Sequence, residues 1–186
     1  SGIYADVDLV NAHPRILLAL ARKLDISEKG TAALQQCVSD REKYLARVSS
    51  DRSAAKRMML AAIFGQGIGA NERSNVAYMQ YRREVDAIRR IFYNSGLSES
   101  YREVASPTNR KASTLSQYLC EKEFQLVKLA MEWLSAQGWQ TDVVVFDGIF
   151  VRNEQPPKLS TNHMQNLSEW VSERSGIDVH FSMTSF

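Results

Sequence analysis

The residues with the most specific chemical pattern recur at every fourth position in one stretch of the chain. They are Arg52, Lys56, Leu60 and Phe64, and Gly65 follows directly. Four residues exceed one helical turn by only about 40°, so these side chains form one slowly winding stripe on a helix. Guanidinium and ammonium groups match phosphate oxygens, and an aromatic ring can stack on a base. The spacing is therefore compatible with a surface that binds a triphosphate at one end and a base at the other.

An amphipathic helix without any ligand produces the same pattern. In that interpretation Arg52 and Lys56 form a solvated edge, while Leu60 and Phe64 pack in the core. The stripe by itself leaves both interpretations open.

The order and spacing of the stripe closely resemble motif B of family A nucleotide polymerases. That motif reads Arg, three residues, Lys, three residues, a residue facing the sugar, three residues, then Tyr or Phe followed by Gly. The match needs no gap. By this resemblance Arg52 and Lys56 hold the incoming triphosphate. Leu60 lies near the sugar, Phe64 stacks near the templating pair, and Gly65 adjoins the nucleic acid.

Two further segments resemble motifs A and C of the same family. Asp8 is followed seven residues later by Arg15, as in motif A, where a catalytic Asp ends a palm strand. Asp147 lies between two apolar runs, as in motif C. The resemblance implies that Asp8 and Asp147 bind two Mg²⁺ ions, which Mn²⁺ can replace. Such ions activate the primer hydroxyl and stabilise the leaving pyrophosphate.

Both aspartates also have structural interpretations. An Asp-Gly pair between two apolar runs is ordinary hairpin chemistry, and Asp8 could simply cap the helix that follows it. Asp6 is a competing metal ligand, because alternate side chains of a strand lie on the same face. Asp8 is preferred because it aligns with Arg15.

Motif C departs from the family, in which it usually reads His-Asp-Glu. Here Phe146 and Gly148 flank Asp147. The accessory carboxylate is therefore missing, and its role could pass to Glu121 or Asp6.

The sugar of the nucleotide is expected to meet His13. This residue occupies the motif A position at which DNA polymerases of the family place a Glu that crowds the 2′-hydroxyl. Phe64 in place of Tyr removes a hydroxyl near the sugar, and a packed aromatic ring there favours deoxynucleotides.

Contacts with the primer-template are expected from Arg15 and from a long helix after motif B. Family A enzymes present Arg, Asn and Gln to the minor groove there, and Arg110 and Gln117 are the candidates. Ordinary exposed polar residues are the alternative. Another helix carries five arginines that could follow a phosphate backbone or form a solvated face. They are Arg73, Arg82, Arg83, Arg89 and Arg90.

Together these features predict template-directed nucleotidyl transfer by a DNA polymerase that uses dNTPs and two metal ions. The predicted partners are a primer-template and nucleoside triphosphates. The alternatives are a non-catalytic nucleic-acid-binding module derived from a decayed palm, an RNA polymerase or primase-like enzyme, and a two-metal nuclease. Neutral replacement of Asp8 and Asp147 separates the enzyme from the binding module, because only the enzyme needs both carboxylates.

The elements that must position these residues follow from hydrophobic periodicity. Alternation predicts strands at 3–10, 142–146, 149–151 and 177–183, with a tight hairpin at Asp147-Gly148. Helical spacing predicts helices at 15–24, 31–49, 52–64, 71–94, 108–137 and 160–174, with a loop at 95–107. The expected fold is α+β: a polymerase palm with a small, mainly antiparallel sheet, several helices on one side, and inserted helical fingers.

Composition is compatible with such a domain. With 186 residues, of which 44% are hydrophobic and 24% charged, we expect a single catalytic domain, with the palm at 3–30 and 100–186 and the fingers at 31–99. No apolar run approaches the ~20 residues of a membrane span, so a soluble, intracellular protein is expected. Two cysteines without a CxxC pair and three scattered histidines argue against zinc.

The net charge of +2 requires any nucleic-acid binding to come from local basic faces. No segment resembles a proofreading exonuclease or the thumb that precedes motif A in this family. We therefore expect either a minimal enzyme of low processivity or part of a larger replication protein with further domains.

Overall fold

The computed structural model describes residues 3–67, 69, 71–145, 148–153 and 158–185. The chain divides into two compact units, which are described separately. Unit 1 comprises Ser1–Ile16 and Glu121–Phe186, and unit 2 comprises Leu17–Cys120. Both boundaries fall within helices, namely α1 (Ala12–Lys23) and α7 (Arg110–Ala136).

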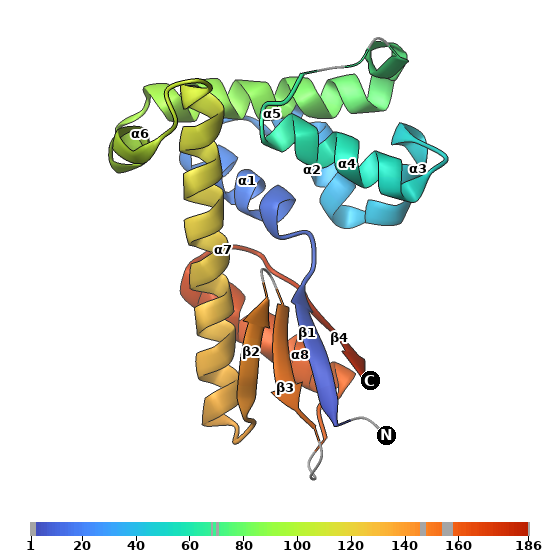
Figure 1. The fold of residues 1–186 in the computed structure, drawn as a ribbon, viewed down its shortest axis with the longest axis vertical. Helices are drawn as coiled ribbons and strands as arrows, with labels where there is room; N and C mark the ends of the chain where they lie inside the picture. Colours follow the sequence, from blue (N-terminus) through green and yellow to red (C-terminus); the bar gives the residue numbers. More distant parts are fainter. Residues whose placement is uncertain (1–2, 68, 70, 146–147, 154–157, 186) are drawn as a thin grey trace. The chain divides into compact units, whose positions relative to one another are not determined.

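Unit 1 contains a four-stranded sheet in the order β2-β3-β1-β4 (Figure 1). In this order β1, the first strand in the sequence, lies inside the sheet between β3 and β4. Every neighbouring pair of strands is antiparallel. The α+β prediction with a small antiparallel sheet is confirmed. The strands are β1 (Tyr4–Leu9), β2 (Thr141–Val145), β3 (Gly148–Arg152) and β4 (Phe181–Ser185).

Strand β1 alternates strictly between buried and half-buried residues. Its buried residues are Ala5, Val7 and Leu9. Ala5 lies opposite Val151 of β3, and Val7 lies opposite Ile149. Because directly opposite residues of an antiparallel pair share a face, these side chains form one apolar face of the sheet. The remaining residues of β1 lie on the other face, called the open face below.

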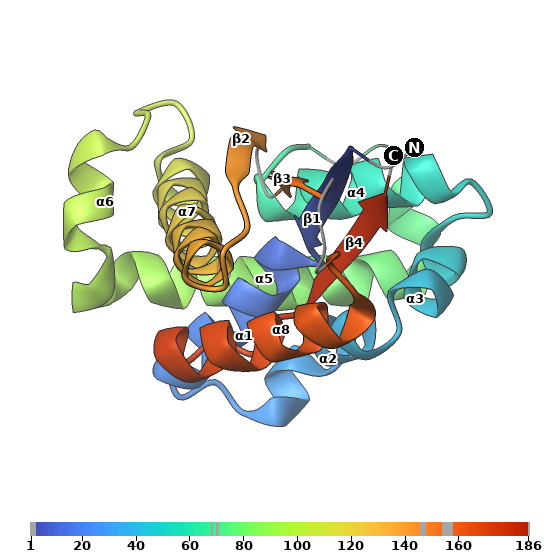
Figure 2. The same cartoon turned by 90° about the horizontal axis from the view of Figure 1, so that it is seen from below.

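Helix α8 (Thr161–Ser175) packs beside β4, and both ribbon views draw it along one side of the strands (Figures 1 and 2). The helix begins after Ser160, which forms a capping box with His163. Phe181 of β4 lies opposite Leu9 and is buried, so α8 covers the apolar face. The sheet is therefore packed on one side by a helix.

Unit 2 is helical, and α5 is its centre, packing against α2, α3 and α4. Three aromatic and two aliphatic side chains of α5 are fully buried, which explains this central position. None of the described helices combines the length and the apolar character needed to cross a bilayer. The helices are α2 (Ala32–Ser39), α3 (Arg41–Val48), α4 (Arg52–Ile63), α5 (Val76–Asn94) and α6 (Glu99–Val104).

Two helices that were predicted as continuous are interrupted by a capping residue. The predicted helix 31–49 divides at Asp40, whose carboxylate accepts a hydrogen bond from the backbone N–H of Lys43 and caps α3. The predicted helix 71–94 divides at Asn75, whose side chain accepts from the N–H of Tyr78 and caps α5. Short Asp and Asn side chains compete with the helical backbone in this way.

The loop predicted at 95–107 was wrong, because it contains a 3₁₀ turn at Gly96–Ser98 and the helix α6. Tyr101 of α6 packs against the rings of Phe92 and Tyr118, with ring centroids 6.1 and 5.4 Å away. This aromatic cluster stabilises a short helix that local sequence signals did not indicate.

The hairpin between β2 and β3 differs by one position from the prediction. Val145 pairs with Gly148, so Gly148 belongs to β3 instead of the connection. The antiparallel pairing itself is confirmed. Phe146 and Asp147 lie outside the described residues.

Helix α4 ends at Phe64 and Gly65 in a Schellman motif. The N–H of Gly65 donates to the carbonyl of Ala62 at 3.3 Å, and the N–H of Gln66 donates to that of Ala61 at 2.9 Å. Gly65 has φ +67°, which favours glycine. A Cβ at this position would lie only 2.6 Å from the Cβ of Ala112 in α7. Both the backbone conformation and the close approach therefore require glycine.

Arg89 of α5 secures the same end of α4. Its buried guanidinium donates to the carbonyl oxygens of Ala62 and Ile63 at 2.5 and 2.9 Å and also pairs with Asp86. Carbonyls in the last turn lack partners within the helix, so a cation from a neighbouring helix stabilises them.

Glu84 of α5 caps α2 from a different helix. Thr31, the residue at the cap position, makes no capping hydrogen bond with its side chain. The buried carboxylate of Glu84 instead accepts from the backbone N–H groups of Ala33 and Leu34, both at 2.9 Å. A tertiary contact thus does what a local cap does in most helices.

We expect Gly65→Ala to lower the free energy of unfolding by at least about 2 kcal/mol, the sum of left-handed strain and overpacking against Ala112. Gly67→Ala is the matched control, because nothing lies within 4 Å of a Cβ there. Urea unfolding of both variants measures the difference, and equal stabilities would contradict the close-approach argument.

We expect Glu84→Ala to destabilise the protein by about 2 to 4 kcal/mol, because two buried N–H groups lose their acceptor. Glu84→Gln should cost less, since its amide oxygen can still accept one hydrogen bond. Burial raises the pKa of Glu84 against the opposing effect of the two N–H donors. A raised pKa means that stability falls as pH rises from the ordinary carboxyl pKa towards the raised one. Thermal melts across this pH range should show that slope in the parent and lose it in Glu84→Gln.

Candidate functional site

The predicted stripe on α4 lies on the accessible side of the helix. Arg52 and Leu60 are exposed, and Lys56 and Phe64 are half-buried. Leu60 exposes 46% of its surface, so the interpretation in which it packs in the core is wrong. The opposite side of α4 supplies the core, through Ala55, Met59, Ala62 and Ile63.

The N-terminus of α4 places Arg52 where an anion is favoured. Asp51 caps the helix as predicted, and its Oδ1 accepts from the N–H groups of Ser53 and Ala54 at 2.8 and 3.2 Å. Arg52 is therefore the first residue of α4. The positive end of the helix dipole adds to the charge of the guanidinium.

A carboxylate from α3 already contacts Arg52. Glu42 accepts two hydrogen bonds, from Nε at 2.7 Å and from Nη2 at 2.6 Å. The hydrogen bond from Arg52 lowers the pKa of Glu42, and the charges of Arg41 and Lys56 add to this effect. Burial and the charges of Arg41 and Arg52 lower the pKa of Lys56. We call Arg41, Arg52 and Lys56 the basic cluster.

The sequence did not single out Arg41 or Glu42. Their role depends on the packing of α3 against α4, which brings together residues ten positions apart in different helices. The available signal was only the charged run at 40–43, which is equally typical of an exposed helix start.

The N-terminal part of α7 lies beside the end of α4. The side chain of Asn109, just before α7, donates to the carbonyl of Gly65 at 3.3 Å. Arg110 is exposed, and its guanidinium donates to the backbone carbonyl of Arg102. Gln117 is also exposed and lies seven residues, or about two turns, further along the same face. Unit 2 therefore places Arg110 near Gly65, and exposed Gln117 lies on the same face of α7 as Arg110.

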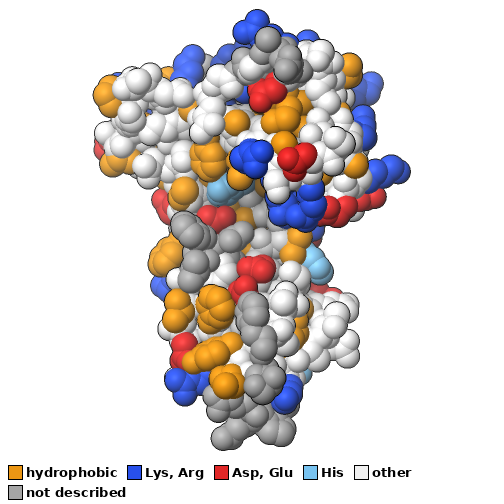
Figure 3. Space-filling model, turned by 45° about the vertical axis from the view of Figure 1, so that its right-hand side comes forward, with side chains coloured by type: hydrophobic (Ala, Val, Ile, Leu, Met, Phe, Trp, Pro, Cys, Tyr) orange, Lys and Arg blue, Asp and Glu red, His pale blue; other side chains and the backbone are white. Residues whose placement is uncertain are grey.

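The five arginines of the predicted basic helix do not act alike. Arg82 donates to the carbonyl of Gln66 at 2.6 Å, and Arg89 is buried at the end of α4, so both have structural roles. The other three are exposed: Arg73, Arg83 and Arg90. On the face drawn in Figure 3, acidic and basic side chains of the described residues are interspersed. Two of the five arginines therefore bind backbone carbonyls of unit 2, and the other three are exposed to solvent.

On the open face of unit 1, Asp8 has two small neighbours. It lies opposite Gly148 of β3 and opposite Ser182 of β4. Because opposite residues share a face, the residues beside Asp8 on the open face are a glycine and a serine. Gly148 also directly follows Asp147 in the sequence. Mg²⁺ prefers oxygen ligands, and of these three residues Asp8 supplies a carboxylate and Ser182 a hydroxyl.

Asp6 lies on the same face as Asp8, about 7 Å along the strand. Its neighbours in register are larger, namely Phe150 and Thr184. Among the residues that the structure describes, no group of three or more His, Cys, Asp or Glu side chains is arranged to hold a metal ion. Asp147, the predicted partner of Asp8, lies outside those residues.

Asp142 of β2 is an aspartate with a structural role in this sheet. Its carboxylate accepts hydrogen bonds from Tyr4, Gln140 and Arg152 at 2.9, 2.9 and 2.6 Å. The hydrogen bond from Arg152 lowers the pKa of Asp142. Asp142 therefore stabilises the edge of the sheet.

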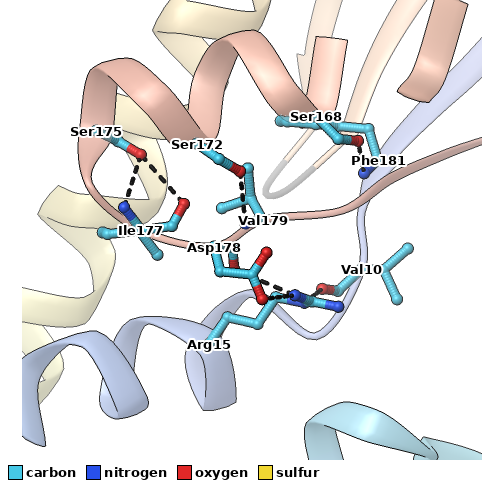
Figure 4. Close-up of polar contacts among 9 residues, drawn as sticks. All are labelled: Val10, Arg15, Ser168, Ser172, Ser175, Ile177, Asp178, Val179 and Phe181. Carbon is cyan, nitrogen blue, oxygen red and sulfur yellow. Dashed lines mark hydrogen bonds and ion pairs between the residues drawn. The ribbon is translucent and has the colours of Figure 1, made fainter. Parts of the chain in front are cut away.

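Arg15 and His13 follow β1 in the first turns of α1. The guanidinium of Arg15 donates to the carbonyls of Val10 and Asp178 at 3.2 and 3.1 Å, and to the Asp178 carboxylate at 3.1 Å (Figure 4). His13 Nε2 lies 3.4 Å from Glu123 Oε1 in α7. Unit 1 thus binds both side chains to its own residues near the end of β1.

The prediction of a strand at 177–183 was wrong at its start, because β4 begins only at Phe181. Val179 donates its N–H to Ser172 Oγ at 3.0 Å, and the N–H of Ile177 donates to Ser175 Oγ at 3.1 Å (Figure 4). These serines of α8 bind the backbone that would otherwise extend the strand.

The fold is similar to that of a solved polymerase domain, the POL domain of Pol1 from M. smegmatis in complex with DNA primer-template and dNTP. The TM-score is 0.57 and the sequence identity is 14%, over 98% of this chain and 39% of that chain. No family model and no curated protein matches the sequence. At this identity the comparison shows a shared fold, and the chain spans well under half the length of that polymerase chain.

Proposed function

We propose that this chain carries out template-directed nucleotidyl transfer as a DNA polymerase of the family A type. The observation that carries the proposal is the accessible stripe of Arg52, Lys56, Leu60 and Phe64 in motif B order on α4. It occurs in a chain whose fold resembles a DNA polymerase domain.

In unit 2, the proposed nucleotide ligands are those on α4. Arg52 and Lys56 bind the triphosphate, where two cations and the start of the helix favour anions. Exposed Leu60 contacts the sugar, and half-buried Phe64 stacks near the base pair. The exposed residues Arg110 and Gln117, with Gly65, are proposed to contact the primer-template.

In unit 1, the proposed metal ligands are Asp8 and Asp147, with Asp6 as the alternative to Asp8. When bound, two Mg²⁺ or Mn²⁺ ions lower the pKa of the primer 3′-hydroxyl and stabilise negative charge on the phosphates. The small neighbours of Asp8 support this assignment.

His13 and Arg15 are proposed to act at the end of β1. Arg15 binds Val10 and Asp178, so it holds the turn that follows Asp8 in a fixed conformation. His13 is proposed to border the sugar. Substrate partners are therefore a DNA primer-template and dNTPs.

We expect Asp8→Asn and Asp147→Asn each to lower the rate of primer extension by about 10²-fold or more, because metal ions supply several kcal/mol of charge stabilisation. The measurement is extension of a labelled primer-template with Mg²⁺ or Mn²⁺ and either dNTPs or NTPs. Asp25→Asn is the control, since Asp25 has φ +54°, which Asn tolerates.

Each alternative function gives a different result in this assay. Duplex binding without extension, unchanged in both aspartate variants, would indicate a non-catalytic binding module. Extension with NTPs alone would indicate an RNA polymerase or primase-like enzyme. Shortening of the primer would indicate a nuclease.

We expect Lys56→Ala to raise the KM for dNTP by about tenfold or more, the value of a charge-assisted hydrogen bond. Arg57→Ala is the matched control, because Arg57 is exposed and points about 100° away from Lys56 around α4. Steady-state extension kinetics measure both variants. An equal rise in KM for both would indicate a general effect of positive charge instead of a defined contact.

A further inference from the structure

The contact between Glu42 and Arg52 uses the edge of the guanidinium that also binds phosphate. Glu42 Oε2 accepts from Nε, and Oε1 accepts from Nη2. Two parallel N–H groups bind carboxylate and phosphate oxygens with the same geometry. A phosphate that binds Arg52 in this manner must therefore displace the carboxylate.

The contact is also one that a polyanion can displace. The side chains of Arg52 and Glu42 expose 56% and 61% of their surface. Ion pairs in water contribute little net stability, so exchanging this carboxylate for another anion costs little. Whether Arg52 binds Glu42 or an anion from solution therefore depends on the charge and the concentration of that anion.

Two more cations surround this contact. Arg41 precedes Glu42 at the start of α3, and Lys56 lies one turn after Arg52 on α4. Burial lowers the pKa of Lys56, and the charges of Arg41 and Arg52 lower it further, because like charges disfavour the ammonium form. An incoming anion with several negative charges relieves this repulsion better than one carboxylate does.

We propose that Glu42 is a resident competitor for phosphate at Arg52, and that a triphosphate replaces it and is bound by Arg41, Arg52 and Lys56 together. Glu42 then lowers the apparent affinity of every anion that uses this edge of Arg52, and only a polyanion that also reaches Arg41 and Lys56 gains enough to bind well. Arg41 is an additional substrate-binding residue. The inference rests on the proposed nucleotide site.

Titration of the purified protein with inorganic tripolyphosphate at low salt tests this directly by calorimetry. Glu42→Gln should bind tripolyphosphate about two- to fivefold more tightly, the range of an exposed ion pair. Inorganic phosphate should gain affinity by a similar factor, because removal of the competing carboxylate helps every anion that must displace it. Glu28→Gln is the control, because it removes the same charge from another exposed position of unit 2.

Arg41→Gln should bind tripolyphosphate severalfold more weakly. Its control is Lys43→Gln, which removes a positive charge from the exposed side of the same helix. Equal losses in the two variants would mean that α3 acts only through its total charge, and would overturn the role of Arg41.

Weaker or unchanged binding by Glu42→Gln, with an unchanged melting temperature, would overturn the competitor role. Weaker binding would mean that Glu42 holds Arg52 in its binding conformation, and unchanged binding would mean that Glu42 has no part in anion binding. If Glu42→Gln melts early, Glu42→Asp replaces it, since the shorter side chain keeps the charge but loses reach. No binding of tripolyphosphate by any variant would also overturn the inference.

Primer extension in parallel separates this inference from the proposed function. Extension by the parent with the same dNTP KM in Glu42→Gln would reject the competitor and leave the polymerase intact. Tighter tripolyphosphate binding by Glu42→Gln in a protein that never extends a primer would support the competitor role and reject the polymerase function.

Discussion

The end of α4 is the constraint on which the arrangement of unit 2 depends. Gly65 must adopt a left-handed conformation, and a Cβ there would lie only 2.6 Å from the Cβ of Ala112. Arg89 binds the last carbonyls of the helix. These contacts fix the rotation of α4 about its own axis. Once Ala55, Met59, Ala62 and Ile63 face the core, the stripe that begins at Arg52 has to face solvent.

A comparable constraint operates in unit 1 through the alternation of β1. Ala5, Val7 and Leu9 are buried, so the period of two places Asp6 and Asp8 together on the open face. The strand register then gives the two aspartates different neighbours. Asp8 lies between Gly148 and Ser182, while Asp6 lies between larger side chains. A shift of one residue would bury both carboxylates.

Electrostatics in the basic cluster are governed by exposure. Deeply buried charges such as Arg89 need fixed partners and serve the fold. The contact between Glu42 and Arg52 is exposed, so its partners can be exchanged at little cost. Arginine thus has a structural role at position 89 in α5 and a proposed binding role at position 52 in α4. The roles differ because water and ligands reach only the exposed guanidinium of Arg52.

Much of this protein is determined by local sequence. The strand 3–10, the helix that Asp51 caps, the long helix α7 and the pairing of β2 with β3 all follow from period, caps and turn residues, because these signals act over a few positions. The order of Arg52, Lys56, Leu60 and Phe64 is likewise written in the chain. Only the tertiary structure decided that Leu60 is exposed, that Glu84 caps α2, that Tyr101 stabilises α6, and that Glu42 binds Arg52. Each of these depends on packing between helices, and hydrophobic periodicity within one helix carries no information about which neighbour it will meet.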